Sequence, residues 1–208
     1  MSAPVPVPDP AKPRLTPTDW MRRRFKGALD PIAGALIKVG LTPNLMTGLG
    51  FLLSVAGAAL LSQGWLTWGG LLLLIAGPFD ALDGAMARLL GQPTQFGAFV
   101  DSVTDRWSEM LVFLGLLYFY LQRGDSLACI LVLVATMGSV MVSYTKARGE
   151  ALGFDVNVGV LTRMERYLVL APLLVLNLPL VALWIVAVLA NVTALQRALH
   201  VRRQSRQK

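Results

Sequence analysis

The chain has 208 residues, of which 55% are hydrophobic and 15% charged, and its mean hydropathy is +0.59. This composition is typical of a polytopic membrane protein and excludes an ordinary soluble domain. The single histidine and the single cysteine exclude a histidine-based zinc site and an internal disulfide. The net charge is +7. The positions of the basic residues predict contact with the inner membrane surface and with anionic substrates, and we expect no nucleic acid as partner.

The first forty residues differ in character from the rest of the chain. Residues 1–17 are rich in proline and predict a disordered tail. Residues 18–40 combine basic residues with apolar ones at roughly helical spacing, which predicts an amphipathic helix in the membrane interface. The apolar run after Pro31 is interrupted by Lys38 and is too short to cross a bilayer. We therefore expect a kink or restart at Pro31 within the interfacial segment.

Six largely apolar runs follow, and most approach or exceed the roughly 20 residues that a helix needs to cross a bilayer. The fifth run is the shortest. We expect an all-α domain of six transmembrane helices over residues 41–202, followed by a basic tail at 203–208. Glycines and alanines crowd the first three runs, which predicts close helix packing. The six runs are 43–63, 66–90, 95–121, 126–150, 162–177 and 179–200.

The distribution of positive charge predicts the topology. When the N-terminus is placed in the cytoplasm, only Arg123 of the nineteen Lys and Arg residues lies on the far side. Both chain ends then face the cytoplasm. We expect a multi-pass protein of the cell inner (plasma) membrane, with its polar site open to the cytoplasm.

Four carboxylates stand inside or beside these apolar runs. Asp80 and Asp83 are three residues apart and Asp101 and Asp105 are four apart, so on helices each pair shares one face. A hairpin that turns near Gln92 brings all four to a similar depth. Charges at membrane depth are costly and mark functional sites, and four acids repel each other unless cations lie among them. We expect one or two divalent ions with oxygen ligands, of the Mg²⁺ or Mn²⁺ type.

The four carboxylates also allow three roles without a catalytic metal. They could form buried ion pairs with Arg88 and Arg106, but four acids against two arginines leave charge uncompensated. They could line an ion path in a cation transporter, but the far halves of the runs contain almost no acids. They could also belong to a scaffold without activity. A metal cluster at a cytoplasmic mouth suits phosphate chemistry, with a carboxylate as proton acceptor.

A second cluster is basic. The fourth run closes with S-Y-T-K-A-R, and the fifth opens with R-M-E-R. Lys146, Arg163 and Arg166 are expected at the same cytoplasmic mouth as the aspartates, where arginine can hold phosphate in a bidentate fork. The basic residues of the C-terminus fit ordinary positive-inside placement instead. They are Arg202, Arg203, Arg206 and Lys208.

The stretch from Asp80 to Asp105 resembles the signature of the CDP-alcohol phosphatidyltransferases, D-x2-D-G-x2-A-R-x8-G-x3-D-x3-D, at every fixed position. The resemblance covers nearly the whole chain and implies an enzyme with six spans and a basic N-terminal interfacial helix. It implies that Asp80, Asp83, Asp101 and Asp105 bind a metal pair and that Asp105 is the base. It also implies a homodimer. The residues implied at the nucleotide are Asn44, Thr47, Asp80, Gly84, Ala87, Arg88 and Gly97, with Gly97 allowing close helix approach.

The acceptor is suggested by S-Y-T-K-A-R-G-E followed by T-R-M-E-R, which resembles the actinobacterial phosphatidylinositol phosphate synthases. The implied reaction transfers the phosphatidyl group of CDP-diacylglycerol to inositol 1-phosphate and releases CMP. Glycerol 3-phosphate also needs a cationic pocket, so phosphatidylglycerol phosphate synthase stays open. The residues implied at the acceptor phosphate are Ser143, Lys146, Arg148, Arg166 and a C-terminal arginine at Arg197 or Arg202.

Overall fold

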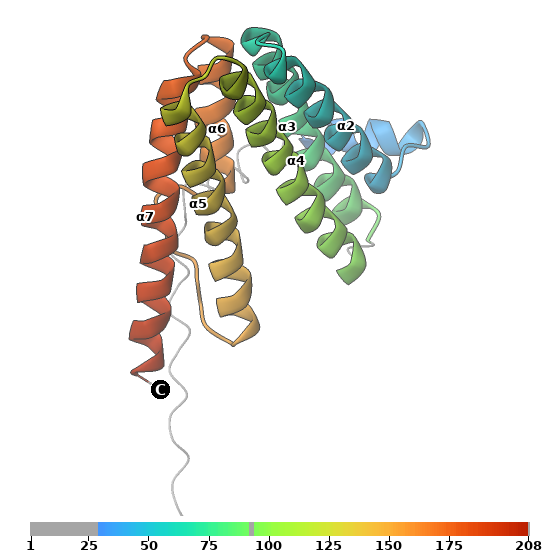
Figure 1. Ribbon diagram of the computed structural model, residues 1–208. Helices are drawn as coiled ribbons and strands as arrows, with labels where there is room; N and C mark the ends of the chain where they lie inside the picture. The colour runs from blue at the N-terminus through green and yellow to red at the C-terminus, as the bar shows by residue number, and fades with distance from the viewer. Residues whose placement is uncertain (1–28, 92–93, 208) are drawn as a thin grey trace, which may run out of the picture.

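The computed structural model describes residues 29–91 and 94–207, and every regular element in these ranges is a helix. The tail predicted for residues 1–17 lies outside the described residues, as do the first part of the predicted interfacial helix and Gln92. Six long helices follow the predicted runs (Figure 1). They are α2 (Pro43–Ser62), α3 (Leu66–Leu89), α4 (Gln95–Gln122), α5 (Ser126–Ala151), α6 (Arg163–Val175) and α7 (Pro179–Ser205).

Local sequence explains where these helices begin. The side chains of Thr42, Thr94 and Asp125 accept hydrogen bonds from backbone N–H groups in the first turns of α2, α4 and α5. Proline occupies the first position of α2 and of α7, where its missing N–H removes no helical bond. The ends of the helices agree with the predicted runs within two residues, except that α7 continues to Ser205.

The helices form two groups of three. Helix α2 packs against α3 and α4, α5 packs against α7, and the groups meet through α3 with α6 and α4 with α5. Figure 1 shows α2–α4 on one side of the molecule and α5–α7 on the other. Buried apolar side chains fill the interior, among them Phe113, Leu116, Leu174, Leu183 and Val186.

Small residues set the closest helix contacts, as predicted. A Cβ added to Gly57 would lie 3.3 Å from the Gly69 carbonyl oxygen, so α2 and α3 meet backbone to backbone. A Cβ added to Gly115 would collide with the Ala58 carbonyl group, which places α4 equally close to α2. Among the described atoms, none lies within 4 Å of such a Cβ on Gly48, so this glycine takes no part in the packing seen here.

The described chain begins with a helix at residues 29–38, which lies transverse to α2 and α3 in Figure 1. Ala33 is fully buried in a small cluster with Met46, near the start of α2, and Met86, near the end of α3. Gly40, with φ of 88°, follows the end of this helix, close to the predicted boundary. The segment therefore braces the end of the bundle at which the aspartates lie.

Four helices, α2, α3, α5 and α7, are long and apolar enough to cross a membrane. Helix α4 has the length but carries four charged residues between positions 101 and 109, namely Asp101, Asp105, Arg106 and Glu109. Helix α6 has 13 residues, which at about 1.5 Å per residue is shorter than the roughly 30 Å hydrocarbon core. The helix lies within the run predicted at 162–177, with Thr162 as its N-cap and Asn177, with φ of 59°, just beyond its C-cap Leu176.

Candidate active site

Helices α3 and α4 carry the four aspartates toward one another, as the predicted hairpin requires. Asp83 and Asp105 are buried, with 6% and 7% exposure, while Asp80 and Asp101 are half-buried. Helix α2 approaches this level closely, because a Cβ on Gly50 would lie 3.4 Å from Oδ1 of Asp80. The site is therefore enclosed by three helices of the first group.

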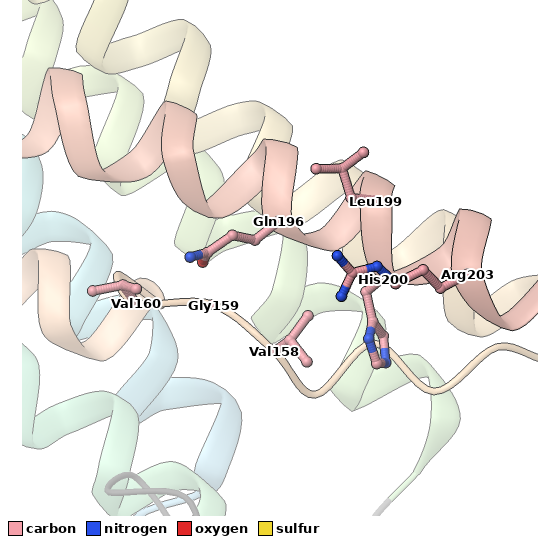
Figure 2. Close-up of a pocket in the computed structure, with 7 residues that line it drawn as sticks. All are labelled: Val158, Gly159, Val160, Gln196, Leu199, His200 and Arg203. Atoms are coloured by element: carbon pink, nitrogen blue, oxygen red, sulfur yellow. The ribbon is translucent and has the colours of Figure 1, made fainter.

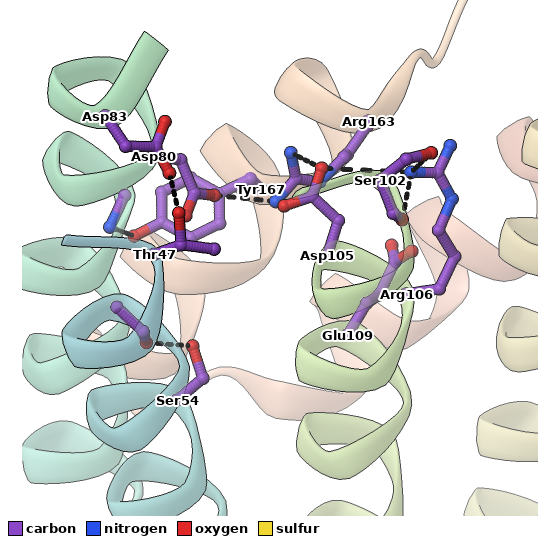
Figure 3. A network of polar contacts seen from close by, with 12 residues as sticks. Thr47, Ser54, Asp80, Asp83, Ser102, Asp105, Arg106, Glu109, Arg163 and Tyr167 are labelled. Atoms are coloured by element: carbon purple, nitrogen blue, oxygen red, sulfur yellow. Dashed lines mark hydrogen bonds and ion pairs between the residues drawn. The ribbon is translucent and has the colours of Figure 1, made fainter. Parts of the chain in front are cut away.

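The Arg163 guanidinium lies between Asp80 of α3 and Asp105 of α4 (Figure 3). Its Nη2 donates to Oδ2 of Asp80 at 2.6 Å, and its Nη1 forms an ion pair with Oδ2 of Asp105. Helix α6 of the second group thus closes the site that α3 and α4 form. The contact shows that a positive group fits between these two carboxylates.

Asp83 has a different partner. The Thr47 hydroxyl of α2 donates to Oδ2 of Asp83 at 2.6 Å (Figure 3). The carboxylates of Asp80 and Asp101 lie close enough to repel the carboxylate of Asp83 electrostatically. Thr47, predicted near a nucleotide, therefore also orients an aspartate.

The donor set fits a pair of hard divalent cations. Four carboxylates on two facing helices supply oxygen ligands and excess negative charge, which Mg²⁺ and Mn²⁺ prefer. Within residues 29–91 and 94–207, no three acidic, histidine or cysteine side chains converge closely enough to hold an ion as they stand. Arg163 takes up two of the carboxylates instead.

Tyr167 was not anticipated as a site residue. Its hydroxyl oxygen accepts a hydrogen bond from the Gly77 N–H of α3 at 2.9 Å, one turn before the first aspartate. The next residue, Pro78, lies inside α3 and has no N–H to donate, so α3 is weakened at this point. A Cβ on Gly77 would lie 2.6 Å from the Tyr167 hydroxyl, so only glycine leaves room for the tyrosine. Tyr167 therefore fixes the part of α3 from which Asp80 projects.

Glu109 was also missed. It lies on α4 one turn beyond Asp105, and its two carboxylate oxygens accept hydrogen bonds from Arg166 at 2.7 and 2.9 Å. Arg166 is only 1% exposed. A spacing of four residues after Asp105 could have pointed to Glu109, since it continues the acidic face of α4. The structure uses this acid to hold α6 against α4.

The basic residues predicted at the acceptor come from α5, α6 and α7. Arg197 of α7 is buried, donates to the carbonyl oxygens of Val142 and Val158, and lies close enough to Arg166 for mutual repulsion. Lys146 lies 3.6 Å from Glu150 on α5. The remaining predicted residues of α5 are the half-buried Ser143 and the exposed Arg148, and Arg202 is exposed on α7.

The residues predicted at the nucleotide lie on α2, α3 and the start of α4. Asn44 and Arg88 are exposed and Gly84 and Ala87 are half-buried. Among the described atoms, a Cβ on Gly84 would meet only Arg88, at 3.5 Å. A Cβ on Gly97 would likewise meet only the Thr94 hydroxyl in the described part of the chain, so the expected close helix approach there is not seen.

A cavity of about 60 Å³ extends inward from the aspartates. Its polar lining groups come from Asp80, Asp105, Glu109, Arg163 and Arg166, and Ser54, Ser108 and Tyr167 add hydroxyl groups. Two of the four aspartates and the two arginines of α6 therefore face one interior space, although they lie on different halves of the bundle.

Known proteins share this sequence and fold. The family model for CDP-alcohol phosphatidyltransferase matches residues 40–196. A relative from Streptomyces avermitilis, named phosphatidylinositol phosphate synthase, is 36% identical over 202 residues, which cover 89% of this chain and 82% of the relative.

Two crystal structures of Mycobacterium tuberculosis phosphatidylinositol phosphate synthase are similar to this chain, each with 37% identity. The structure with CDP-DAG bound has a TM-score of 0.77 and covers 83% of this chain and 92% of its own. The structure in complex with manganese and citrate has a TM-score of 0.78 and covers 83% and 88%. The chain belongs to the CDP-alcohol phosphatidyltransferase family and is a transferase of that class.

Proposed function

We propose that this protein transfers the phosphatidyl group of CDP-diacylglycerol to a hydroxyl of inositol 1-phosphate and releases CMP. The observation that carries the proposal is that Arg163 joins Asp80 to Asp105 at an interior space that the buried Arg166 also lines. Carboxylates that could bind the metals and arginines that could bind a phosphorylated acceptor thus line the same space. The similarity to a phosphatidylinositol phosphate synthase, and to a mycobacterial one with CDP-DAG bound, supports the proposal.

In the proposed reaction one bond to phosphorus forms and one breaks. The acceptor hydroxyl oxygen forms a bond to the β-phosphorus of CDP-diacylglycerol, and the bond from that phosphorus to the bridging oxygen of the pyrophosphate breaks. CMP leaves with the bond's electrons. The hydroxyl proton passes to Asp105, which is buried on α4 with its carboxylate directed at the site.

We assign the metal site to Asp80, Asp83, Asp101 and Asp105. Two ions of the Mg²⁺ or Mn²⁺ type, when bound, polarise phosphate oxygens and lower the pKa of an attacking hydroxyl. Arg163 already places a positive group between two of the four carboxylates, which supports the assignment. The manganese complex of the mycobacterial structure supports it too.

The nucleotide site is assigned to residues around the first two aspartates, and the acceptor phosphate to basic residues of the second helix group. Arg166 donates to Glu109, and Arg197 donates to two backbone carbonyl oxygens. To bind the acceptor phosphate, each guanidinium must therefore donate to the phosphate in addition to these partners. The nucleotide residues are Asn44, Thr47, Asp80, Gly84, Ala87, Arg88 and Gly97. The acceptor residues are Ser143, Lys146, Arg148, Arg166 and Arg197.

We further propose that all six long helices lie in the inner membrane, with α4 and α6 completing the four apolar spans, and that both chain ends and the site face the cytoplasm. In this organisation residues 41–202 form the catalytic domain after an interfacial segment at 18–40. The protein acts as a homodimer, which light scattering of the detergent-solubilised protein tests.

The acceptor is tested with detergent-purified protein, CDP-diacylglycerol and Mg²⁺, given either inositol 1-phosphate or glycerol 3-phosphate. We expect CMP and a new anionic lipid with inositol 1-phosphate. Lipid product from glycerol 3-phosphate alone would overturn the assignment in favour of phosphatidylglycerol phosphate synthase. Arg148→Gln is expected to raise the KM for the acceptor and not that for CDP-diacylglycerol, whereas the exposed Arg206→Gln should change neither.

A further inference from the structure

A groove of about 360 Å³ lies between α7 and the segment that joins α5 to α6 (Figure 2). Residues 158–160 form one wall, and Gln196, Leu199, His200 and Arg203 form the other. None of these residues lines the cavity at the aspartates. The groove is therefore distinct from that cavity, although Arg197, which we assign to the acceptor phosphate, contacts its wall at Val158.

The wall of the groove is held in place by polar contacts to α7. Nε of Arg197 donates to the Val158 carbonyl oxygen at 2.9 Å, and the Leu161 N–H donates to the Thr193 hydroxyl at 2.9 Å. Gly159 has φ of 133°, and a Cβ there would collide with the Thr193 side chain. Hydrogen bonds and close packing therefore fix this segment against α7.

The lining of the groove is amphiphilic. His200 and Arg203 supply its ionisable groups, no Asp or Glu lines it in the described part of the chain, and Leu199 and residues 158–160 supply its apolar surface. Figure 2 shows His200 and Arg203, about one turn apart on α7, beside the segment. Arg202 and Arg206 add exposed positive charge to the same end of α7.

An apolar stripe continues from the groove toward the middle of α7. Val188, Val192, Leu195 and Leu199 recur every three or four residues and are 50%, 41%, 60% and 42% exposed. In the proposed topology this stripe faces the hydrocarbon, while Arg203 lies at the level of the cytoplasmic headgroups. An occupant therefore meets positive charge at one end and a continuous apolar track at the other.

We propose that this groove binds one anionic phospholipid, with its phosphate at His200 and Arg203 and an acyl chain along the stripe. Basic pockets at the cytoplasmic side of membrane helices suit such headgroups. A free phosphate would leave the apolar track unused. Binding here secures the segment that leads directly into Arg163 and Arg166 of α6, so the lipid stabilises the α6–α7 side of the site.

The test is native mass spectrometry of the delipidated full-length protein, titrated in micelles with phosphatidylglycerol or phosphatidylcholine. We expect one phosphatidylglycerol to bind at least fivefold more tightly than phosphatidylcholine. Arg203→Gln should weaken this binding roughly fivefold, the effect of losing one basic residue near a lipid headgroup. The control Arg206→Gln, which removes the same charge outside the groove, should leave this single site within twofold. Arg203→Lys should retain most of the preference.

Three outcomes would overturn the proposal. Equal losses in Arg203→Gln and Arg206→Gln would show general surface attraction, and equal affinity for the two lipids would show an apolar contact only. Full competition by inorganic phosphate would show a free-anion site. Circular dichroism of each variant separates unfolding from lost binding. The readout does not depend on catalysis, so it stands or fails independently of the proposed acceptor.

Discussion

Replacing Glu109 with glutamine is expected to destabilise the bundle by about 3 kcal/mol, because the Arg166 guanidinium would stay buried without its counter-charge. Arg166 is 1% exposed and donates to both carboxylate oxygens of Glu109, at 2.7 and 2.9 Å. Removing one partner of such a pair costs about 3–5 kcal/mol. The Glu109 side chain retains 18% exposure, so water can offset part of the loss and the lower end of that range applies.

The matched control is Glu150→Gln. Its partner Lys146 lies 3.6 Å away, and the two side chains are 47% and 42% exposed, so about 0–1 kcal/mol is expected. Both variants are unfolded by denaturant in mixed micelles and followed by circular dichroism. Glu109→Gln combined with Arg166→Met should recover part of the loss, since neither charge then remains buried. A stability within about 0.5 kcal/mol of wild type for Glu109→Gln alone would refute this reasoning.

Three further substitutions test the contacts around the site. Thr47→Val removes the hydrogen bond to Asp83, so transferase activity in a CMP-release assay should fall. Thr47→Ser keeps the hydroxyl and should keep the activity. Tyr167→Phe leaves the Gly77 N–H of α3 without its acceptor and should lower the free energy of unfolding by denaturant by about 1–3 kcal/mol. An unchanged free energy of unfolding would show that water replaces the hydroxyl. Gly115→Ala should cost about 1–3 kcal/mol, because its Cβ meets the α2 backbone. Gly48→Ala is its control and should be neutral or stabilising by up to about 1 kcal/mol, so equal losses would contradict the close packing.

The fold was largely predictable because apolar length and turn residues leave few alternatives in a membrane protein. All six long helices appear where the apolar runs predict them. Helix α6 is the shortest of the six, as predicted for the fifth run, and it begins with charged residues that belong to the site. Apolar content could not reveal that Arg163 points at aspartates more than fifty residues away.

The site was predictable where its residues repeat along one helix. The spacing of Asp80 with Asp83, and of Asp101 with Asp105, fixed a shared face in each case. Contacts between helices were not predictable in this way. Glu109 and Tyr167 act through partners on other helices, and the burial of Arg197 against backbone carbonyls follows from the packing of the segment before α6.

The central claim is that the carboxylate cluster performs phosphatidyl transfer with Asp105 as base. It is tested most directly by measuring CMP release from CDP-diacylglycerol with inositol 1-phosphate and Mg²⁺, in wild type and Asp105→Asn protein of equal helical content. Loss of a general base typically lowers the rate about 10²–10⁴-fold, and we expect a loss of that size with CDP-diacylglycerol binding retained. An Asp105→Asn enzyme with unchanged CMP release would contradict the account.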